Sequence, residues 1–188
     1  AGVYMGCGLG GSETLQDHYG RFFLNPGKSS RLITIPKVMP NGPASHVSIT
    51  FGIRGPTVTH SIACASSSVA IGEAFRAVRH GYLSLVLAGG TEAQLNPGTL
   101  SGWAALGVMA VPHVGGPGVS CRPFDVERSG LVLGEGAAVL LLESAESMNA
   151  RGARPLAEIV GYGIASDASS LTQPTIEGQC RALTDAMA

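Results

Sequence analysis

Short apolar runs alternate with segments of helical periodicity along the chain. Runs that are short, apolar and bounded by turn residues predict strands, whereas apolar residues spaced three and four apart predict helices. Alternation of this kind indicates a layered α/β architecture. The predicted strands are 3–5, 57–63, 83–88, 137–142 and 157–165, and the apolar runs 83–88 and 137–142 are expected to be buried on both faces. The predicted helices are 12–23, with Ser12 as its candidate cap, one within 41–50, one through 71–78, 144–151 and one that follows Thr175.

The strand over 57–63 runs directly into Cys64, and a helix with an apolar stripe follows. A thiol between a strand and a helix start lies at the positive end of the helix dipole, which favours the thiolate and makes a nucleophile. The same helix end has unpaired N–H groups that can stabilise an oxyanion. The alternative is a small buried residue between Ala63 and Ala65, but the triple serine 66–68 and the strand-to-helix position favour the nucleophile.

Composition limits the classes of protein that fit. The chain has 188 residues with 27 Gly, 11 Pro and 45% hydrophobic residues, which is typical of one folded, turn-rich domain. Charged residues make up only 13%, against about 25% in an ordinary soluble domain, so we expect another subunit or further sequence to cover part of the surface. The net charge of −1 and the lack of a basic cluster argue against nucleic-acid binding. No run approaches the ~18 apolar residues of a membrane span, so we expect a cytoplasmic protein.

The other candidate chemistry is weaker. The segment Gly6 to Gly11 fits the G-x-G-x-x-G pattern of dinucleotide sites, but the acidic residue expected about 20 positions later is absent, which leaves close backbone packing as the alternative. None of the five histidines has a catalytic setting, and an extended strand would place His60 some 13 Å from Cys64. The cysteines Cys7, Cys121 and Cys180 are assigned structural roles. The spacing of possible ligands predicts neither a metal nor a cofactor.

Several motifs, taken in order, are shared with a known family. The sequence resembles the β-ketoacyl-acyl-carrier-protein synthases of the KAS II kind, in the thiolase-like superfamily, over essentially its whole length. The motifs are Gly55-Pro56-Thr57-Val58, Ser61-Ile62-Ala63-Cys64-Ala65-Ser66-Ser67, Leu87-Ala88-Gly89-Gly90-Thr91-Glu92, Arg122-Pro123-Phe124-Asp125, Gly134-Glu135-Gly136-Ala137 and Ser166-Asp167-Ala168.

This resemblance implies a thiolase-like layered α/β/α fold, with 1–188 as an N-terminal ketosynthase domain that is truncated at both ends. It implies that Cys64 accepts an acyl group from an acyl carrier protein and that a malonyl thioester then loses CO₂ and condenses with that group. The family's two catalytic histidines and its lysine would lie in a C-terminal half beyond these residues. A homodimer is implied as well.

The resemblance also assigns lesser roles and leaves two alternatives. Trp103 is expected to line the acyl channel, and Lys28, Arg31 and Lys37 are candidates to meet the carrier protein. A non-catalytic, chain-length-type partner subunit is one alternative, although such partners usually replace the thiol that Cys64 retains. A Rossmann-like nucleotide-binding domain built on the glycine-rich segment is the other.

Overall fold

The computed structural model describes residues 1–25, 27 and 31–188. Four strands form one sheet: β1 (Gly2–Gly6), β2 (Thr57–His60), β3 (Leu85–Glu92) and β4 (Gly136–Glu143). Their order is β2-β1-β3-β4, and β1 is parallel to both β2 and β3. Gly6 is in register with His60 on one side and with Gly90 on the other, so β1 and β2 end at the same level.

Seven α-helices connect and flank the strands in the part of the chain that is described. The predicted helices near 12–23, 41–50, 71–78, 144–151 and after Thr175 are confirmed. Two helices were missed, Thr34–Val38 and Pro97–Ala105. The first is only five residues long and contains Pro36. Gly and Pro punctuate the surroundings of the second, although Asn96 before Pro97 is a helix-start signal. The helices are α1 (Ser12–Leu24), α2 (Thr34–Val38), α3 (Gly42–Phe51), α4 (Ser66–Arg79), α5 (Pro97–Ala105), α6 (Ala145–Ala150) and α7 (Ile176–Met187).

Internal contacts divide the chain into two compact units. The first unit holds Ala1–Gly8, Pro43–Gly90 and Ala138–Ala188, and the second holds Leu9–Gly42 and Thr91–Ala137. The first unit therefore contains β1, β2, nearly all of α3, α4 and most of the sheet. Cys64 belongs to the first unit and Trp103 to the second.

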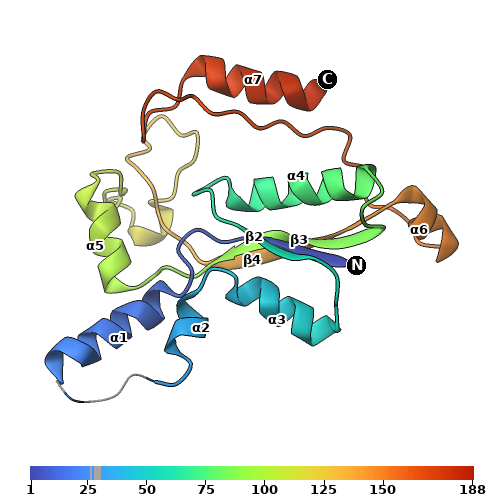
Figure 1. The fold of residues 1–188 in the computed structure, drawn as a ribbon. Coiled ribbons are helices and arrows are strands. Elements are labelled where there is room, and N and C mark those ends of the chain that lie inside the picture. Colours follow the sequence, from blue (N-terminus) through green and yellow to red (C-terminus); the bar gives the residue numbers. More distant parts are fainter. Residues whose placement is uncertain (26, 28–30) are drawn as a thin grey trace. The chain divides into compact units, whose positions relative to one another are not determined.

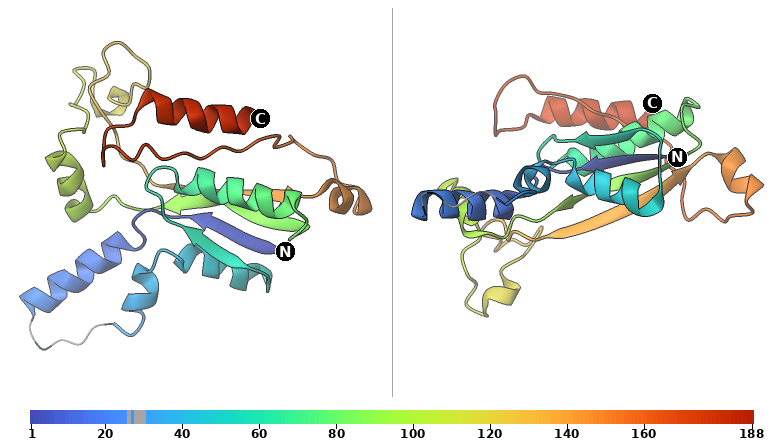
Figure 2. Two further views of the ribbon diagram at one scale, coloured as in Figure 1. Left: turned by 45° about the horizontal axis from the view of Figure 1, so that its top comes forward. Right: turned by 60° about the horizontal axis from the view of Figure 1, so that its bottom comes forward.

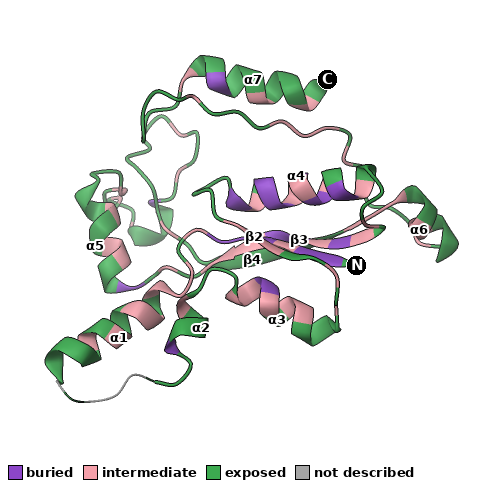
Figure 3. Cartoon of the chain, in the orientation of Figure 1, coloured by how far each residue is buried: buried purple, intermediate pink, exposed green. Residues whose placement is uncertain are grey.

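In the first unit, α3 and α4 cover opposite faces of the sheet (Figure 1 and Figure 2). Alternate residues of β1 explain this arrangement, because successive strand side chains point to opposite faces. Val3 and Met5 pack with Ala44 of α3, whereas Tyr4 packs into a cluster that includes Ala74 of α4. The buried residues gather on β1 and α4 (Figure 3). The predicted layered α/β/α arrangement is confirmed.

The segment 157–165 does not form the predicted strand. Its glycines pack against a helix rather than against a strand: Gly161 lies at the carbonyl of Ala186 and Gly163 at the carbonyl of Ala182, both in α7. Tyr162, between them, lies against Gly72 of α4. The apolar run therefore serves as a packed extended connection along α4 (Figure 1).

β4 is a strand as predicted, but it is not covered on both faces. Its residues from Gly136 to Leu141 are exposed, and only its last residues are partly buried. The reason is its place at the end of the strand order, beyond the central strands that α3 and α4 cover.

The second unit contains α1, α2 and α5. Ser12 was expected to cap α1, but it is the first helical residue and makes no cap bond. Its hydroxyl instead accepts a hydrogen bond from the Asn96 side-chain amide at 2.9 Å. Within the described ranges, no helix of either unit is long and apolar enough to cross a membrane.

Candidate active site

Cys64 lies on a tight turn between β2 and α4. The strand predicted over 57–63 is too long, because β2 ends at His60 and the chain then leaves the sheet. Ala63 has a φ of +45°, in the left-handed region that residues with a Cβ rarely adopt. The chain therefore reverses sharply just before the cysteine, and the strand-to-helix position expected for Cys64 is confirmed.

Ser66 ties the two sides of this turn together. Its side chain is buried, with 4% of the residue exposed. The hydroxyl accepts a hydrogen bond from the Ile62 N–H at 2.8 Å and donates one to the Ala63 carbonyl at 2.6 Å. Its backbone N–H also donates to the Ala63 carbonyl, at 3.2 Å. Ser66, two positions after Cys64, thus holds Ile62 and Ala63, which come before Cys64 in the chain.

The first turn of α4 packs directly against two glycines of the sheet. A Cβ on Gly6 would come well inside 3.0 Å of the Ser66 carbonyl carbon and the Ser67 nitrogen. A Cβ on Gly90 would lie 2.5 Å from the Ser67 Cβ. Because Gly6 and Gly90 are partners in the sheet, the helix start is seated on two adjacent strands. This close approach places the turn that carries Cys64.

Cys64 is exposed in this chain. It precedes α4, whose 14 residues give the N-terminal end a positive potential. The free N–H groups expected around the thiol are fewer than the sequence suggests, since the Ala65 and Ser66 amides donate to the Ile62 and Ala63 carbonyls. The helix dipole is thus the main source of positive potential from these residues.

The other cysteines have different settings. Cys7 is buried just beyond the end of β1, and its N–H donates to the His60 carbonyl at 3.0 Å. Cys121 and Cys180 are exposed, the latter on α7 rather than on a buried helical face. Cys64, Cys121 and Cys180 are free thiols. Among the exposed thiols, Cys64 is the one at the start of a helix seated on the sheet.

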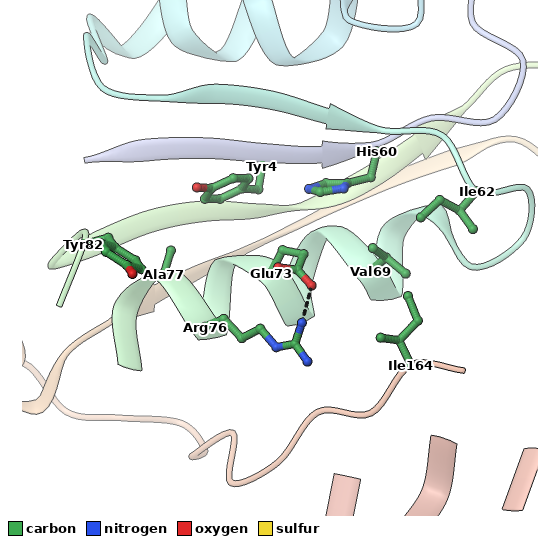
Figure 4. A pocket seen from close by; sticks show the side chains of 9 residues that line it. All are labelled: Tyr4, His60, Ile62, Val69, Glu73, Arg76, Ala77, Tyr82 and Ile164. Carbon is green, nitrogen blue, oxygen red and sulfur yellow. Dashed lines mark hydrogen bonds and ion pairs between the residues drawn. The ribbon is translucent and has the colours of Figure 1, made fainter. Parts of the chain in front are cut away.

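An open groove of about 450 Å³ lies along α4 in the first unit (Figure 4). Its lining does not include Cys64. The His60 and Tyr4 rings lie side by side there, 6.1 Å apart, and Glu73 pairs with Arg76 at 3.0 Å. The lining residues are Tyr4, His60, Ile62, Val69, Glu73, Arg76, Ala77, Tyr82 and Ile164.

His60 and Cys64 do not share this groove. The extended-strand argument for their separation does not apply, because the turn after His60 interrupts the strand. The prediction that His60 does not serve as a base for Cys64 still stands, for another reason. His60 faces Tyr4 and the groove, so the structure does not pair it with the thiol. A base for Cys64 is not supplied by His60.

Trp103 is partly buried on α5 in the second unit. Its indole N–H donates to the Gln94 side-chain oxygen at 3.2 Å. This bond fixes the ring within that unit, and the role of Trp103 in an acyl channel stays a prediction. Of the three basic residues named for the carrier protein, Arg31 and Lys37 are exposed, and Lys28 lies outside the described residues.

The glycine-rich segment connects β1 with α1 as a nucleotide loop would, but its glycines are packed against the chain. Gly10 has a φ of +65° and lies at the Val38 carbonyl, and Gly11 lies at the Lys37 carbonyl. Protein backbone thus occupies the space beside these two glycines. Close packing therefore accounts for the pattern. No cluster of three or more metal-binding side chains occurs among the residues that the structure describes.

The sequence could not reveal how the turn is held. The triple serine was recognised, but nothing in its pattern singles out Ser66 from its neighbours. Gly6 ends β1 after Met5, and Gly90 follows Gly89 within β3. Glycine in a strand is a usable signal for close backbone approach. Their common contact with α4 depends on the strand order, which local patterns do not specify.

Comparison with known proteins gives a consistent result. Residues 1–147 match the family model described as "Beta-ketoacyl synthase, N-terminal domain". Nodulation protein E of Rhizobium leguminosarum bv. trifolii is 41% identical over 187 residues, which is 100% of this chain and 45% of that protein. The 3-oxoacyl-[acyl-carrier-protein] synthase 2 of Staphylococcus aureus is 37% identical over 188 residues, covering 99% of this chain and 46% of that protein.

A solved structure shows the same fold. It is a type II polyketide ketosynthase in complex with its acyl carrier protein, and it superposes with a TM-score of 0.89 at 25% identity. The match covers 99% of this chain and 48% of the solved chain. The chain thus spans a little under half the length of the relatives that it matches.

Proposed function

This chain belongs to the β-ketoacyl synthase family, and from that premise we propose that it carries the acyl-accepting nucleophile of a 3-oxoacyl-[acyl-carrier-protein] synthase. The nucleophile is Cys64. The observation that carries the proposal is an exposed thiol on a sharp turn at the positive end of α4, in a chain with the fold of this family.

In the first step the Cys64 sulfur attacks the carbonyl carbon of an acyl thioester. A new carbon–sulfur bond forms, the carbon–sulfur bond to the phosphopantetheine arm breaks, and the released thiolate takes up the equivalent of the proton that the Cys64 thiol lost. Negative charge develops on the carbonyl oxygen. The resemblance to the β-ketoacyl synthases assigns the Cys64 N–H as one donor to this oxyanion. The Ala65 and Ser66 amides already donate within the turn.

In the second step a malonyl thioester loses CO₂, and its enolate carbon attacks the acyl carbonyl on Cys64. The Cys64 thiolate leaves, and the product is a 3-oxoacyl thioester extended by two carbons. The residues that assist decarboxylation in this family are assigned by resemblance to sequence beyond position 188. The role of the present residues is therefore to take up, hold and release the acyl chain.

The test is an intact-mass measurement on the full-length protein after incubation with a long-chain acyl thioester. The parent is expected to gain the mass of one acyl group. Cys64→Ala is expected to gain none, while Cys121→Ala, which removes another exposed thiol, is expected to behave as the parent. An unchanged parent mass, or equal uptake by Cys64→Ala, would contradict the proposal.

The alternative of a non-catalytic, chain-length-type partner predicts a different result. Such a subunit would keep the fold and shape a pocket without taking up an acyl group. The thiol retained at position 64, together with its exposure, supports the catalytic assignment instead. The intact-mass experiment separates the two, because only the enzyme is acylated.

The proposal includes an acyl carrier protein as donor, a homodimer and a cytoplasmic location. A related ketosynthase has been solved with its carrier protein, which supports the first. Low charge content and the exposed apolar side chains Phe22, Phe23 and Leu24 at the end of α1 fit a surface that another subunit or further sequence covers. The resemblance to the family is what favours a homodimer. Sedimentation of the full-length protein tests the dimer, since a monomer at micromolar concentration would contradict it.

A further inference from the structure

We infer that Ser66 is a positioning residue for Cys64, acting through the turn between β2 and α4. The inference rests on the proposed function, because it gives Ser66 a part in the same acyl transfer. Ser66 does not touch the reacting atoms. It holds the backbone on which the thiol is carried.

The hydrogen bonds of Ser66 enclose the cysteine. Its hydroxyl accepts a hydrogen bond from the Ile62 N–H at 2.8 Å and donates one to the Ala63 carbonyl at 2.6 Å. Cys64 lies between these residues and Ser66 in the chain. Because Ser66 is 4% exposed, water has little access to take over either bond.

The turn needs such a clamp because Ala63 has left-handed backbone geometry. A φ of +45° is strained for alanine and persists only where the surroundings determine it. Ser66 acts on both sides of that strain, through the amide of Ile62 and the carbonyl of Ala63. Loss of its hydroxyl would release Ala63 toward ordinary backbone angles and move Cys64 with it.

The clamp is itself anchored to the sheet. Gly6 admits the backbone of Ser66, and Gly90 admits the side chain of Ser67. The start of α4 is therefore fixed against β1 and β3, and Ser66 transmits that fixed position to the turn. Neighbouring serines differ: Ser68 is exposed and has no part in this contact.

Acyl transfer depends on such placement more than simple alkylation does. The thiolate must approach the carbonyl carbon while the developing oxyanion meets its N–H donor, and a displacement near 1 Å can cost about a hundredfold in rate. A small alkylating reagent needs only an accessible thiolate. Ser66 is thus expected to affect the rate of acyl transfer far more than the rate of alkylation.

The experiment compares the parent, Ser66→Ala, Ser66→Thr and Ser68→Ala in the full-length protein. Two rates are measured by mass spectrometry: acyl uptake from a long-chain thioester and alkylation of Cys64 by iodoacetamide. Ser66→Ala is expected to lower acyl uptake about tenfold or more and alkylation less than about threefold. Ser66→Thr, which keeps the hydroxyl, is expected to restore most of the uptake rate, and Ser68→Ala to match the parent.

A second background keeps the test decisive if Ser66→Ala does not fold. Ala63→Gly removes the Cβ that opposes a positive φ, which lets the turn form without Ser66. Glycine also adopts many other backbone angles equally well, so the two hydroxyl bonds of Ser66 are still needed to hold Cys64 in one position. Ser66→Ala is therefore introduced into that variant as well. Equal acyl uptake by the parent and Ser66→Ala, or equal uptake by the Ala63→Gly variants with and without Ser66, would overturn the inference alone. A parent that takes up no acyl group would overturn the proposed function, and the inference with it.

Discussion

Gly6 and Gly90 show how single residues without side chains set the place of the candidate nucleophile. Neither touches Cys64, yet the backbone and side chains of the first α4 turn occupy the space where their Cβ atoms would be. The position of the thiol therefore depends on two glycines that belong to different strands. Their role is steric, since neither has a φ between +20° and +160°.

Gly6→Ala is predicted to lower the free energy of unfolding by about 1–3 kcal/mol, because the added methyl overpacks rigid backbone. Urea unfolding measures this change. Gly20→Ala on α1 is the control: its Cβ meets no atom within 4 Å, so alanine should stabilise the helix by about 0.5–1 kcal/mol. A Gly6→Ala protein as stable as the parent would show that α4 is not seated as described.

The sequence identifies Cys64 because the features that make it a nucleophile are local: a strand end, a cysteine and a helix start. Ser66 is also close to Cys64 in sequence, but its role depends on the left-handed backbone of Ala63. An alanine in the sequence gives no sign that its φ is positive. Residue type alone thus predicts the reactive atom and misses the residue that holds it.

At the scale of elements, the start of α7 is the best-defined junction outside the turn. Thr175 caps the helix, with its hydroxyl oxygen accepting from the Gly178 N–H at 3.1 Å. The same hydroxyl donates to the Asp167 carboxylate at 2.8 Å, and the Thr175 N–H donates to that carboxylate at 2.9 Å. Asp167 and Thr175 therefore tie the loop before α7 to the start of the helix.

Thr175→Ala is predicted to cost about 1 kcal/mol of stability through loss of this cap. The loss should concentrate in α7 and appear as faster amide hydrogen exchange there. Thr175→Ser, which keeps the hydroxyl, is the matched control. Unchanged exchange in α7 of the alanine variant would contradict the assignment of the cap.

Asp167 gives this junction a pH dependence. Hydrogen bonds from the Thr175 N–H and hydroxyl lower the pKa of Asp167 below its ordinary value of 3.8. A carboxyl with a lowered folded pKa stabilises the fold above its unfolded pKa and loses that effect as pH falls through the folded pKa. The contribution is therefore complete at neutral pH and declines only in acid.

The stability difference between the parent and Asp167→Asn is accordingly predicted to be constant near neutrality and to shrink below about pH 4. Unfolding in urea at a series of pH values measures it. A difference that grows as the pH falls would show that Asp167 is not stabilised as a carboxylate.

Helices and strands differ in how well the sequence predicts them, because helix signals are local whereas the packing of an extended segment depends on distant parts of the chain. Five of the seven helices in the described part of the chain were found because their periodicity and caps are local, as in α7. The run over 157–165 predicts a strand because it is largely apolar, with Gly161 and Gly163 as interruptions. The structure instead uses both glycines to approach α7. The burial of β4 was misjudged for a similar reason, since an edge position cannot be read from an apolar sequence.

At the scale of the whole molecule, few charges are available to guide a partner. Lys37 is exposed on α2 and is a candidate contact for an acidic carrier protein. Lys37→Glu is predicted to slow acyl uptake from the carrier protein by about three- to tenfold at low ionic strength and much less at high salt. Uptake from a small acyl thioester should not change.

Arg154→Glu is the matched reversal, because Arg154 is an exposed cation elsewhere in the chain. Comparable slowing by both reversals would point to a net-charge effect and contradict a local contact at Lys37. The comparison with a small thioester separates carrier recognition from the chemistry at the thiol.

Mapping the acyl group to a single cysteine is the sharpest test of Cys64 as the nucleophile. The full-length protein is incubated with a long-chain acyl thioester, digested under conditions that preserve thioesters, and sequenced by mass spectrometry. The account predicts acylation on the peptide that contains Cys64, with Cys7, Cys121 and Cys180 unmodified. An acyl group on any of those three, with Cys64 free, would contradict it.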